Sequence, residues 1–139
     1  MAQSWVDELD VFGKPWNLGF LLILTHSVLG VLIGGIDDYV FFRIGINKDA
    51  LLLTLWILPV LASYVASRYS KRYKLLMGLS YMVLFPLIGA MVTYINGELG
   101  VMKADFVGVP GAMVVFKLYL AVGSILVILG TALGLVFSK

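Results

Sequence analysis

The sequence contains no cysteine, and this absence removes several classes of chemistry at once. Disulfides, thiol catalysis, iron–sulfur clusters and thiolate metal sites all require cysteine. Histidine occurs once, as His26, so a histidine-based metal site would lack its partner ligands. The sequence also has no phosphate loop, zinc motif, nucleophile elbow or dinucleotide fingerprint. We therefore expect the protein to hold neither a metal nor another cofactor.

Charged residues are scarce as well. They make up 13% of the 139 residues, whereas 61% of the residues are hydrophobic. A soluble domain has about 25% charged and about 45–50% apolar residues. A soluble chain of this length could not bury so much apolar surface in one core, but a bilayer accepts it. So few charged groups leave general acid–base chemistry with few candidates, and we expect the protein not to be an enzyme.

Four long apolar runs account for the hydrophobic excess. Each has roughly the 17–25 residues that a membrane-spanning helix needs. The predicted spans are Leu18–Ile36, Leu51–Ser67, Leu75–Ile95 and Met113–Phe137. These runs should be helical, because backbone polar groups cannot remain unpaired in lipid. The sequence predicts an all-α integral membrane protein, a four-transmembrane-helix bundle that forms a single domain over residues 1–139.

The loops between the spans predict an orientation. The loop Arg68–Lys74 carries four positive charges and no negative charge, whereas the loops Asp37–Ala50 and Asn96–Ala112 carry both signs. Lysine and arginine are retained on the cytoplasmic side of membranes. We expect the basic loop and both termini in the cytoplasm and the other two loops outside, in a bacterial inner membrane. Residues 1–17 are too polar to span and contain a short amphipathic segment that could lie on the cytoplasmic interface.

Small residues recur at helical spacing in the spans. Helices in lipid pack through such residues, because small side chains allow close backbone approach. The candidates for helix packing are Gly30, Gly34, Gly89, Gly123, Gly130 and Gly134. Such stripes are typical of an ordinary bundle within one chain. Since all spans carry them, some could face other subunits, and we predict a homo-oligomer. Pro86 is expected to kink the third span.

His26 is an ionisable residue well inside a predicted span, between Thr25 and Ser27. Ionisable residues at such depth are costly and usually face the bundle interior or water. The imidazole could be neutral and bonded to a neighbouring hydroxyl or carbonyl group. It could instead be a proton-coupling site, since histidine changes its charge near neutral pH. The sequence leaves both interpretations open.

Two further positions could line a pore, and they favour opposite ions. Asp37 and Asp38 follow the first span, where adjacent carboxylates could ring the mouth of an oligomeric channel and concentrate cations. Lys117 lies one turn inside the fourth span. Its amine could snorkel to the outer surface, or it could face a pore and favour anions. The sequence does not decide between the two selectivities.

The basic loop allows three interpretations. The first is that its charges only set the orientation of the protein in the membrane. These charges are Arg68, Lys71, Arg72 and Lys74. They could also bind acidic lipid headgroups. A third interpretation is the capture of an anionic, phosphate-bearing ligand from the cytoplasm, because arginine and lysine beside tyrosine suit phosphates. The sequence identifies no specific protein partner.

From these features we expect a small homo-oligomeric membrane channel or pore, of a kind that could act as the membrane effector of a bacterial stress or defence system and be gated at its basic loop. Two alternatives remain open. Four spans with short loops resemble the small multidrug resistance exporters, which use a glutamate in the first span. This chain has His26 at a roughly similar depth, so the resemblance implies a proton-coupled transporter using His26. The other alternative is a non-catalytic accessory or anchoring subunit.

Overall fold

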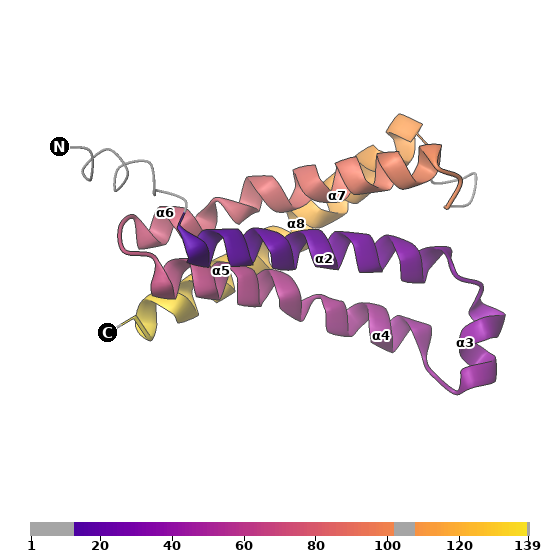
Figure 1. Cartoon of the computed structure of the whole chain (residues 1–139), viewed down its shortest axis with the longest axis horizontal. Coiled ribbons are helices and arrows are strands. Elements are labelled where there is room, and N and C mark those ends of the chain that lie inside the picture. Colours follow the sequence, from indigo (N-terminus) through magenta and orange to yellow (C-terminus); the bar gives the residue numbers. More distant parts are fainter. Residues whose placement is uncertain (1–12, 102–107, 139) are drawn as a thin grey trace.

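The computed structural model describes residues 13–101 and 108–138, and within these two ranges the chain forms helices and no strand (Figure 1). The helices are α2 (Lys14–Gly35), α3 (Asp38–Ile44), α4 (Lys48–Leu55), α5 (Ile57–Tyr69), α6 (Lys74–Leu79), α7 (Tyr81–Glu98) and α8 (Gly108–Val136). The amphipathic segment that we predicted before the first span falls mostly on residues 1–12, which lie outside the described residues.

Four helical segments are long and apolar enough to cross a membrane. They are Lys14–Gly35, Lys48–Tyr69, Lys74–Glu98 and Gly108–Val136. The prediction of an all-helical protein with four such segments is confirmed. The segments are longer than the predicted spans. The first begins at Lys14 rather than Leu18, because Pro15 fits the first turn of a helix, where its missing N–H has no partner to lose.

The second segment is interrupted at Trp56. Helix α4 ends at Leu55, four residues before Pro59, and a proline ring clashes with the carbonyl group at that distance. The Trp56 backbone N–H instead donates to the Leu53 carbonyl oxygen at 3.1 Å, which tightens the last turn. Helix α5 then continues through Pro59 to Tyr69. The break places the Trp56 ring at the junction of α4 and α5.

The third segment is interrupted at Ser80, six residues before Pro86, and the kink expected at Pro86 stays a prediction. Helix α7 runs from Tyr81 through Pro86 without a break. The Ser80 hydroxyl donates to the Met77 carbonyl oxygen at 2.7 Å. Bonds of this kind from serine to the preceding turn often bend helices. The break between α6 and α7 therefore lies at Ser80.

The predicted outer loop Asp37–Ala50 is largely helical. It contains α3, which ends at Gly45 in the left-handed conformation (φ 72°), a conformation that glycine adopts without strain. The Asn47 side chain then caps α4, accepting a hydrogen bond from the Ala50 N–H at 3.1 Å. Phe41 is buried. This connection is therefore a folded element rather than an open loop.

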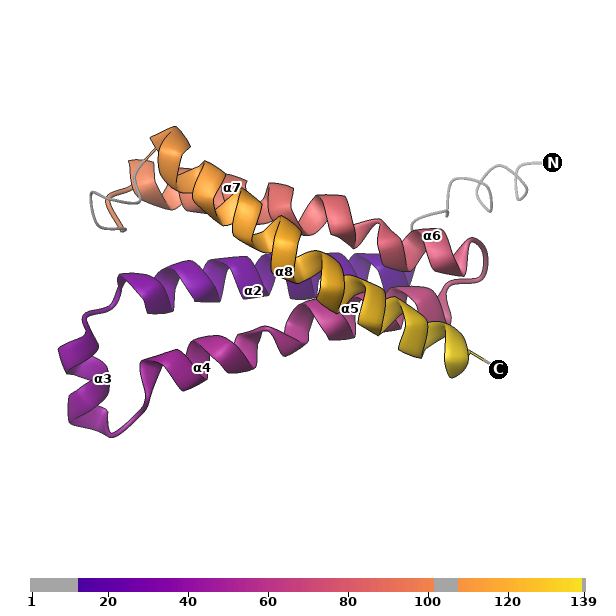
Figure 2. The ribbon, with the colours of Figure 1, turned by 180° about the vertical axis from the view of Figure 1, so that it is seen from behind.

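Helices α5 and α7 lie between α2 and α8, and α8 lies diagonally across from α2. Figure 1 shows α2 in front, and Figure 2 shows α8 in front from the opposite side. We call the end that carries the turn at residues 70–73 the basic end, and the opposite end the α3 end. The first turn of α2 and the last turn of α8 lie at the basic end. At the α3 end, α3 and α4 extend away from α7 and α8 in both views.

The helices approach most closely where α8 crosses α5. A Cβ added to Gly130 would overlap the Ser63 hydroxyl, and one added to Gly134 would lie 2.7 Å from the Tyr64 carbonyl oxygen. Real Cβ atoms essentially never make contacts under 3.0 Å. The Ser67 hydroxyl lies 3.2 Å from the Thr131 carbonyl oxygen of α8. Small residues thus allow α5 and α8 to pack backbone against backbone, as helices do in lipid.

Candidate functional site

Four aromatic rings meet at the centre of the bundle, one from each membrane-spanning segment. They belong to His26 of α2, Trp56 between α4 and α5, Phe85 of α7 and Tyr119 of α8, and we call them the aromatic cluster. The His26 ring centroid lies 5.0 Å from those of Trp56 and Phe85, and 5.4 Å from that of Tyr119. These contacts are edge-to-face, whereas Phe85 and Tyr119 stack at 4.4 Å. Both geometries are favourable for aromatic pairs.

The imidazole of His26 is 2% exposed, and its Nδ1 atom has no hydrogen-bond partner. The two neighbouring hydroxyl groups do not supply one. Thr25 donates to the Leu21 carbonyl oxygen at 2.8 Å, and the buried Ser27 hydroxyl is itself without a partner. The expected bond from a neighbouring hydroxyl or carbonyl group is therefore absent at Nδ1. The ring is held by aromatic contacts, and a charge on it would require rearrangement of the cluster.

The aromatic cluster closes the middle of the bundle. Phe85 is fully buried and Tyr119 is 8% exposed. A groove of about 360 Å³ instead lies on the flank of the bundle, between α7 and α8. Its lining is entirely apolar and includes Ala90, Met91, Ala112, Met113 and Phe116. The described residues thus offer no polar path through the centre of the protomer at the level of His26.

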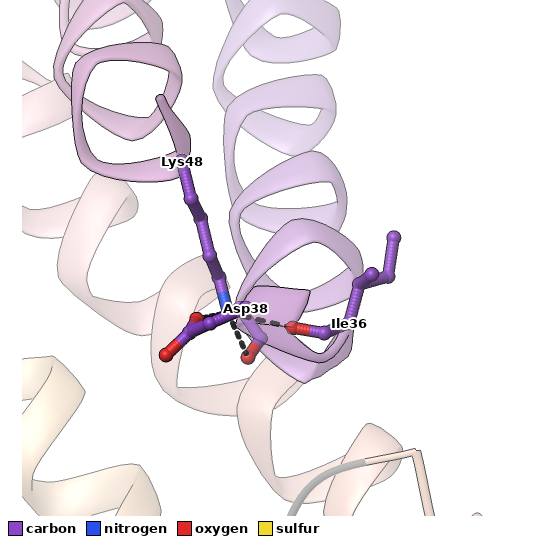
Figure 3. A network of polar contacts seen from close by, with 4 residues as sticks. Ile36, Asp38 and Lys48 are labelled. Carbon is purple, nitrogen blue, oxygen red and sulfur yellow. Dashed lines mark hydrogen bonds and ion pairs between the residues drawn. The ribbon is translucent and has the colours of Figure 1, made fainter. Parts of the chain in front are cut away.

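A polar network joins α2, α3 and α4 at the α3 end (Figure 3). The Lys48 ammonium group donates to the Ile36 carbonyl oxygen at 2.7 Å and to the Gly34 carbonyl oxygen at 3.3 Å, which are unpaired at the end of α2. It also pairs with the Asp38 carboxylate at 2.9 Å. A cation is favourable at a helix C-terminus. Lys48 therefore caps α2 and offsets the charge of Asp38.

The two predicted mouth carboxylates are consequently not equivalent. Asp38 is tied to Lys48 of the same protomer, although its side chain is 89% exposed. Asp37 occupies the position before α3 and is exposed, with no side-chain cap bond. Within the described part of the chain, Asp37 makes no ion pair, whereas Asp38 is paired with Lys48. The acidic ring at a channel mouth stays a prediction.

Lys117 lies on the outer face of α8 and is exposed on the protomer. It follows Gly108, the first residue of α8, by nine positions, which corresponds to about 14 Å of helix. It also precedes Tyr119 of the aromatic cluster by two residues, or about 3 Å. Within residues 13–101 and 108–138, no ion pair forms at Lys117. The structure therefore places the backbone of Lys117 about one third of the way along α8 from the α3 end, on the face that points away from the bundle interior.

The four charges of the basic loop have different surroundings. Arg68 donates to the Tyr64 hydroxyl and lies over the Tyr64 and Tyr69 rings, 5.6 and 5.1 Å from their centroids. The Lys74 ammonium group lies 3.4 Å from the Ser138 carbonyl oxygen, beyond the end of α8. Arg68 and Lys74 thus contact the bundle itself. Lys71 and Arg72 are exposed at the turn.

The predicted packing glycines also separate into two groups. Gly89 lies against the Tyr119 ring and Gly123 against the Phe85 ring, while Gly130 and Gly134 lie against α5. In contrast, a Cβ on Gly30 would have only the Tyr119 hydroxyl nearby, at 3.6 Å, and one on Gly34 would have no atom within 4 Å. The Gly30–Gly34 stripe is therefore not in close contact within the protomer.

Sequence reasoning missed Trp56, Phe85, Tyr119 and Lys48. A usable signal existed for three of them. Trp56 precedes Pro59 within a span, and Tyr119 is a polar aromatic residue well inside a span. Lys48 follows the α2 carbonyl groups closely in sequence. The periodicity of a single helix cannot show that the rings of Trp56, Phe85 and Tyr119 lie at the same height along the bundle as His26. That property depends on the relative positions of different helices.

The sequence matches no protein family, and comparisons with curated proteins and with solved structures find no match. The fold and site therefore define a broad class: an all-helical protein with four helices that can span a membrane and an aromatic cluster at its centre.

Proposed function

We propose that this chain is the subunit of a small homo-oligomeric membrane channel and that ions pass between copies of it. The observation that carries the proposal is the position of Lys117, exposed on α8 near the level of the aromatic cluster. A charged lysine that faces lipid costs up to about 2.5–3.5 kcal/mol at the centre of a helix on insertion scales and less toward its ends, and Lys117 is the tenth of the 29 residues of α8. A water-filled path between copies would remove that cost. The aromatic cluster argues against a path through one protomer.

The distribution of charge supports an orientation for this channel. Lys71 and Arg72 are exposed at the basic end, together with Lys14. All carboxylates of the described residues lie toward the α3 end: Asp37, Asp38, Asp49 and Glu98. By the positive-inside rule, the basic end and both termini would lie in the cytoplasm, and we place the protein in the bacterial inner membrane.

We further propose that the gate responds at the basic end. Lys71 and Arg72 are exposed there, so an anionic cytoplasmic ligand or acidic lipid could bind them without breaking the contacts of Arg68 and Lys74. A channel opened in this way would suit a membrane effector of a bacterial stress or defence response.

The test is ion flux through liposomes that contain the purified protein. We expect flux that rises more steeply than linearly with the protein-to-lipid ratio, because several copies must meet to form one path. Light scattering of the detergent-solubilised protein should give a protein mass that is a multiple of 15.2 kDa. Protein-free liposomes provide the baseline. Flux at the baseline for every ratio, with or without anionic lipid, would refute the channel, and a monomeric mass would refute the oligomer.

A proton-coupled transporter using His26 is the second candidate, and the unpaired Nδ1 atom favours it. His26→Phe separates the two functions, because phenylalanine keeps a ring in the aromatic cluster but carries no titratable proton. Under the channel proposal, His26→Phe conducts like the wild type. Loss of proton-driven uptake in His26→Phe, with the fold retained, would support the transporter instead.

A further inference from the structure

We infer that Lys117 faces the conduction path and makes the channel prefer small inorganic anions such as chloride. This inference rests on the proposed function and assigns a substrate class to it. It also resolves the conflict between the acidic and basic pore candidates of the sequence.

The first step concerns the depth of Lys117. His26, at the level of the aromatic cluster, lies nine residues before the end of α2, or about 14 Å. Lys117 lies about 3 Å from that level toward the α3 end. Its backbone is therefore roughly 10 Å inside the end of α2, well within a hydrocarbon layer about 30 Å thick.

The second step concerns the surroundings of Lys117. It is the one charged residue of α8, and the neighbouring exposed positions of that helix are apolar, including Val114, Leu118 and Ala121. No carboxylate in the described part of the chain pairs with it. Its ammonium group must therefore find water, headgroups or another copy. A face where one charge interrupts an apolar surface suits a path shared between symmetric copies.

The third step concerns the competing negative charges. Lys48 offsets Asp38 within the protomer. Asp37, Asp49 and Glu98 lie at or beyond helix ends at the α3 end, farther from the aromatic cluster than Lys117. In a symmetric oligomer, the Lys117 side chains of all copies would form a ring around the path. The apolar, low-dielectric walls at that depth would strengthen the electric field of this ring. Rings of lysine or arginine favour anions in pores.

The experiment measures reversal potentials in planar bilayers under a KCl gradient. The wild type should show a reversal potential displaced toward the equilibrium potential of chloride. Lys117→Gln should bring the chloride-to-potassium permeability ratio close to unity. Lys117→Glu should reverse the sign of the reversal potential, because it favours potassium. Arg43→Gln removes the same charge from an exposed position of α3 and should leave the potential unchanged.

The outcomes separate the two proposals. Equal reversal potentials for the wild type and Lys117→Gln, or a cation-preferring wild type, would refute the role of Lys117 and leave the channel standing. Absence of conduction in the wild type would refute the channel and the inference with it. If Lys117→Glu fails to fold, Lys117→Gln still decides, because its uncharged side chain is easier to accommodate in lipid.

Discussion

The two ends of the bundle are held together differently. At the basic end, Gly130 and Gly134 of α8 lie directly against α5, and Ser67 bonds across to α8. At the α3 end, α4 buries no residue, and α3 buries only Phe41. The polar network of Lys48 joins the helices there. Close packing resists movement, whereas elements with few buried contacts open at a low free-energy cost. We therefore expect α3 and α4 to open at a lower free-energy cost than the helices packed at the basic end.

The largest effect should come from overfilling the packed end. Gly130→Leu would drive a side chain into Ser63 and the Val60 carbonyl oxygen, which belong to helix α5 and cannot easily move. We expect a loss of about 3 kcal/mol or more in the free energy of unfolding, or no folded protein. Gly34→Leu makes the same change where no atom lies within 4 Å. It should be tolerated, and the measurement is thermal unfolding in detergent by circular dichroism. Equal losses in both variants would contradict the comparison.

The next largest effect should come from the aromatic cluster, where the two ends meet. His26→Ala would leave a cavity among Trp56, Phe85 and Tyr119 and should destabilise the protein by about 2–4 kcal/mol. His26→Phe should restore most of this, since the ring contacts hold the site and Nδ1 has no bond to lose. Denaturant titration in mixed micelles measures both. A His26→Phe variant as unstable as His26→Ala would mean that a polar bond of the imidazole matters.

A smaller, local effect should follow at the α3 end. Lys48→Met keeps an apolar stem but removes the bonds to Ile36, Gly34 and Asp38. We expect a loss of about 1–2 kcal/mol in the local opening free energy of α3, because charge-assisted hydrogen bonds to carbonyl groups are lost. Hydrogen exchange of the α3 amides should quicken while the α5 amides stay unchanged. Arg43→Met is the matched control on α3 itself. Faster exchange throughout the bundle would show that the ends are not independent.

The smallest effect on stability should come from the exposed charges of the basic loop. Lys71→Gln with Arg72→Gln removes two exposed side chains, and we expect no measurable change in the thermal midpoint. The same double variant should abolish any activation of flux by liposomes that contain acidic lipid. Arg68→Gln is the contrasting variant, because it removes the contacts with Tyr64 and Tyr69. Full activation in the double variant would exclude Lys71 and Arg72 as the anion-binding pair.

The sequence predicted features that depend on one helix at a time. Apolar run length predicted the four membrane-spanning-capable helices, because the hydropathy of a segment is a local property. Pro59 could have predicted the end of α4 at Leu55, since the clash of a proline ring is also local. The folded α3 was missed because residues 37–50 were interpreted as a connecting loop outside the membrane.

The site was harder to predict. His26 was singled out as an ionisable residue inside a span, but the rings around it come from three other segments. Their meeting depends on how far each helix slides along its neighbours, which small-residue contacts such as those of Gly89 and Gly123 determine. The pairing of Asp38 with Lys48 likewise depends on the fold of α3. Such contacts leave no periodic trace in a single sequence.

The central claim, a path between copies that Lys117 lines, has one direct test. The chain has no cysteine, so Lys117→Cys introduces a single thiol into an otherwise silent background. We predict that a membrane-impermeant, negatively charged thiol reagent modifies this cysteine in conducting bilayers and blocks the current. Val83 of α7 is 63% exposed, and Val83→Cys is the lipid-facing control that should not react. Unchanged current and an unmodified thiol at position 117, in channels that conduct, would contradict the account.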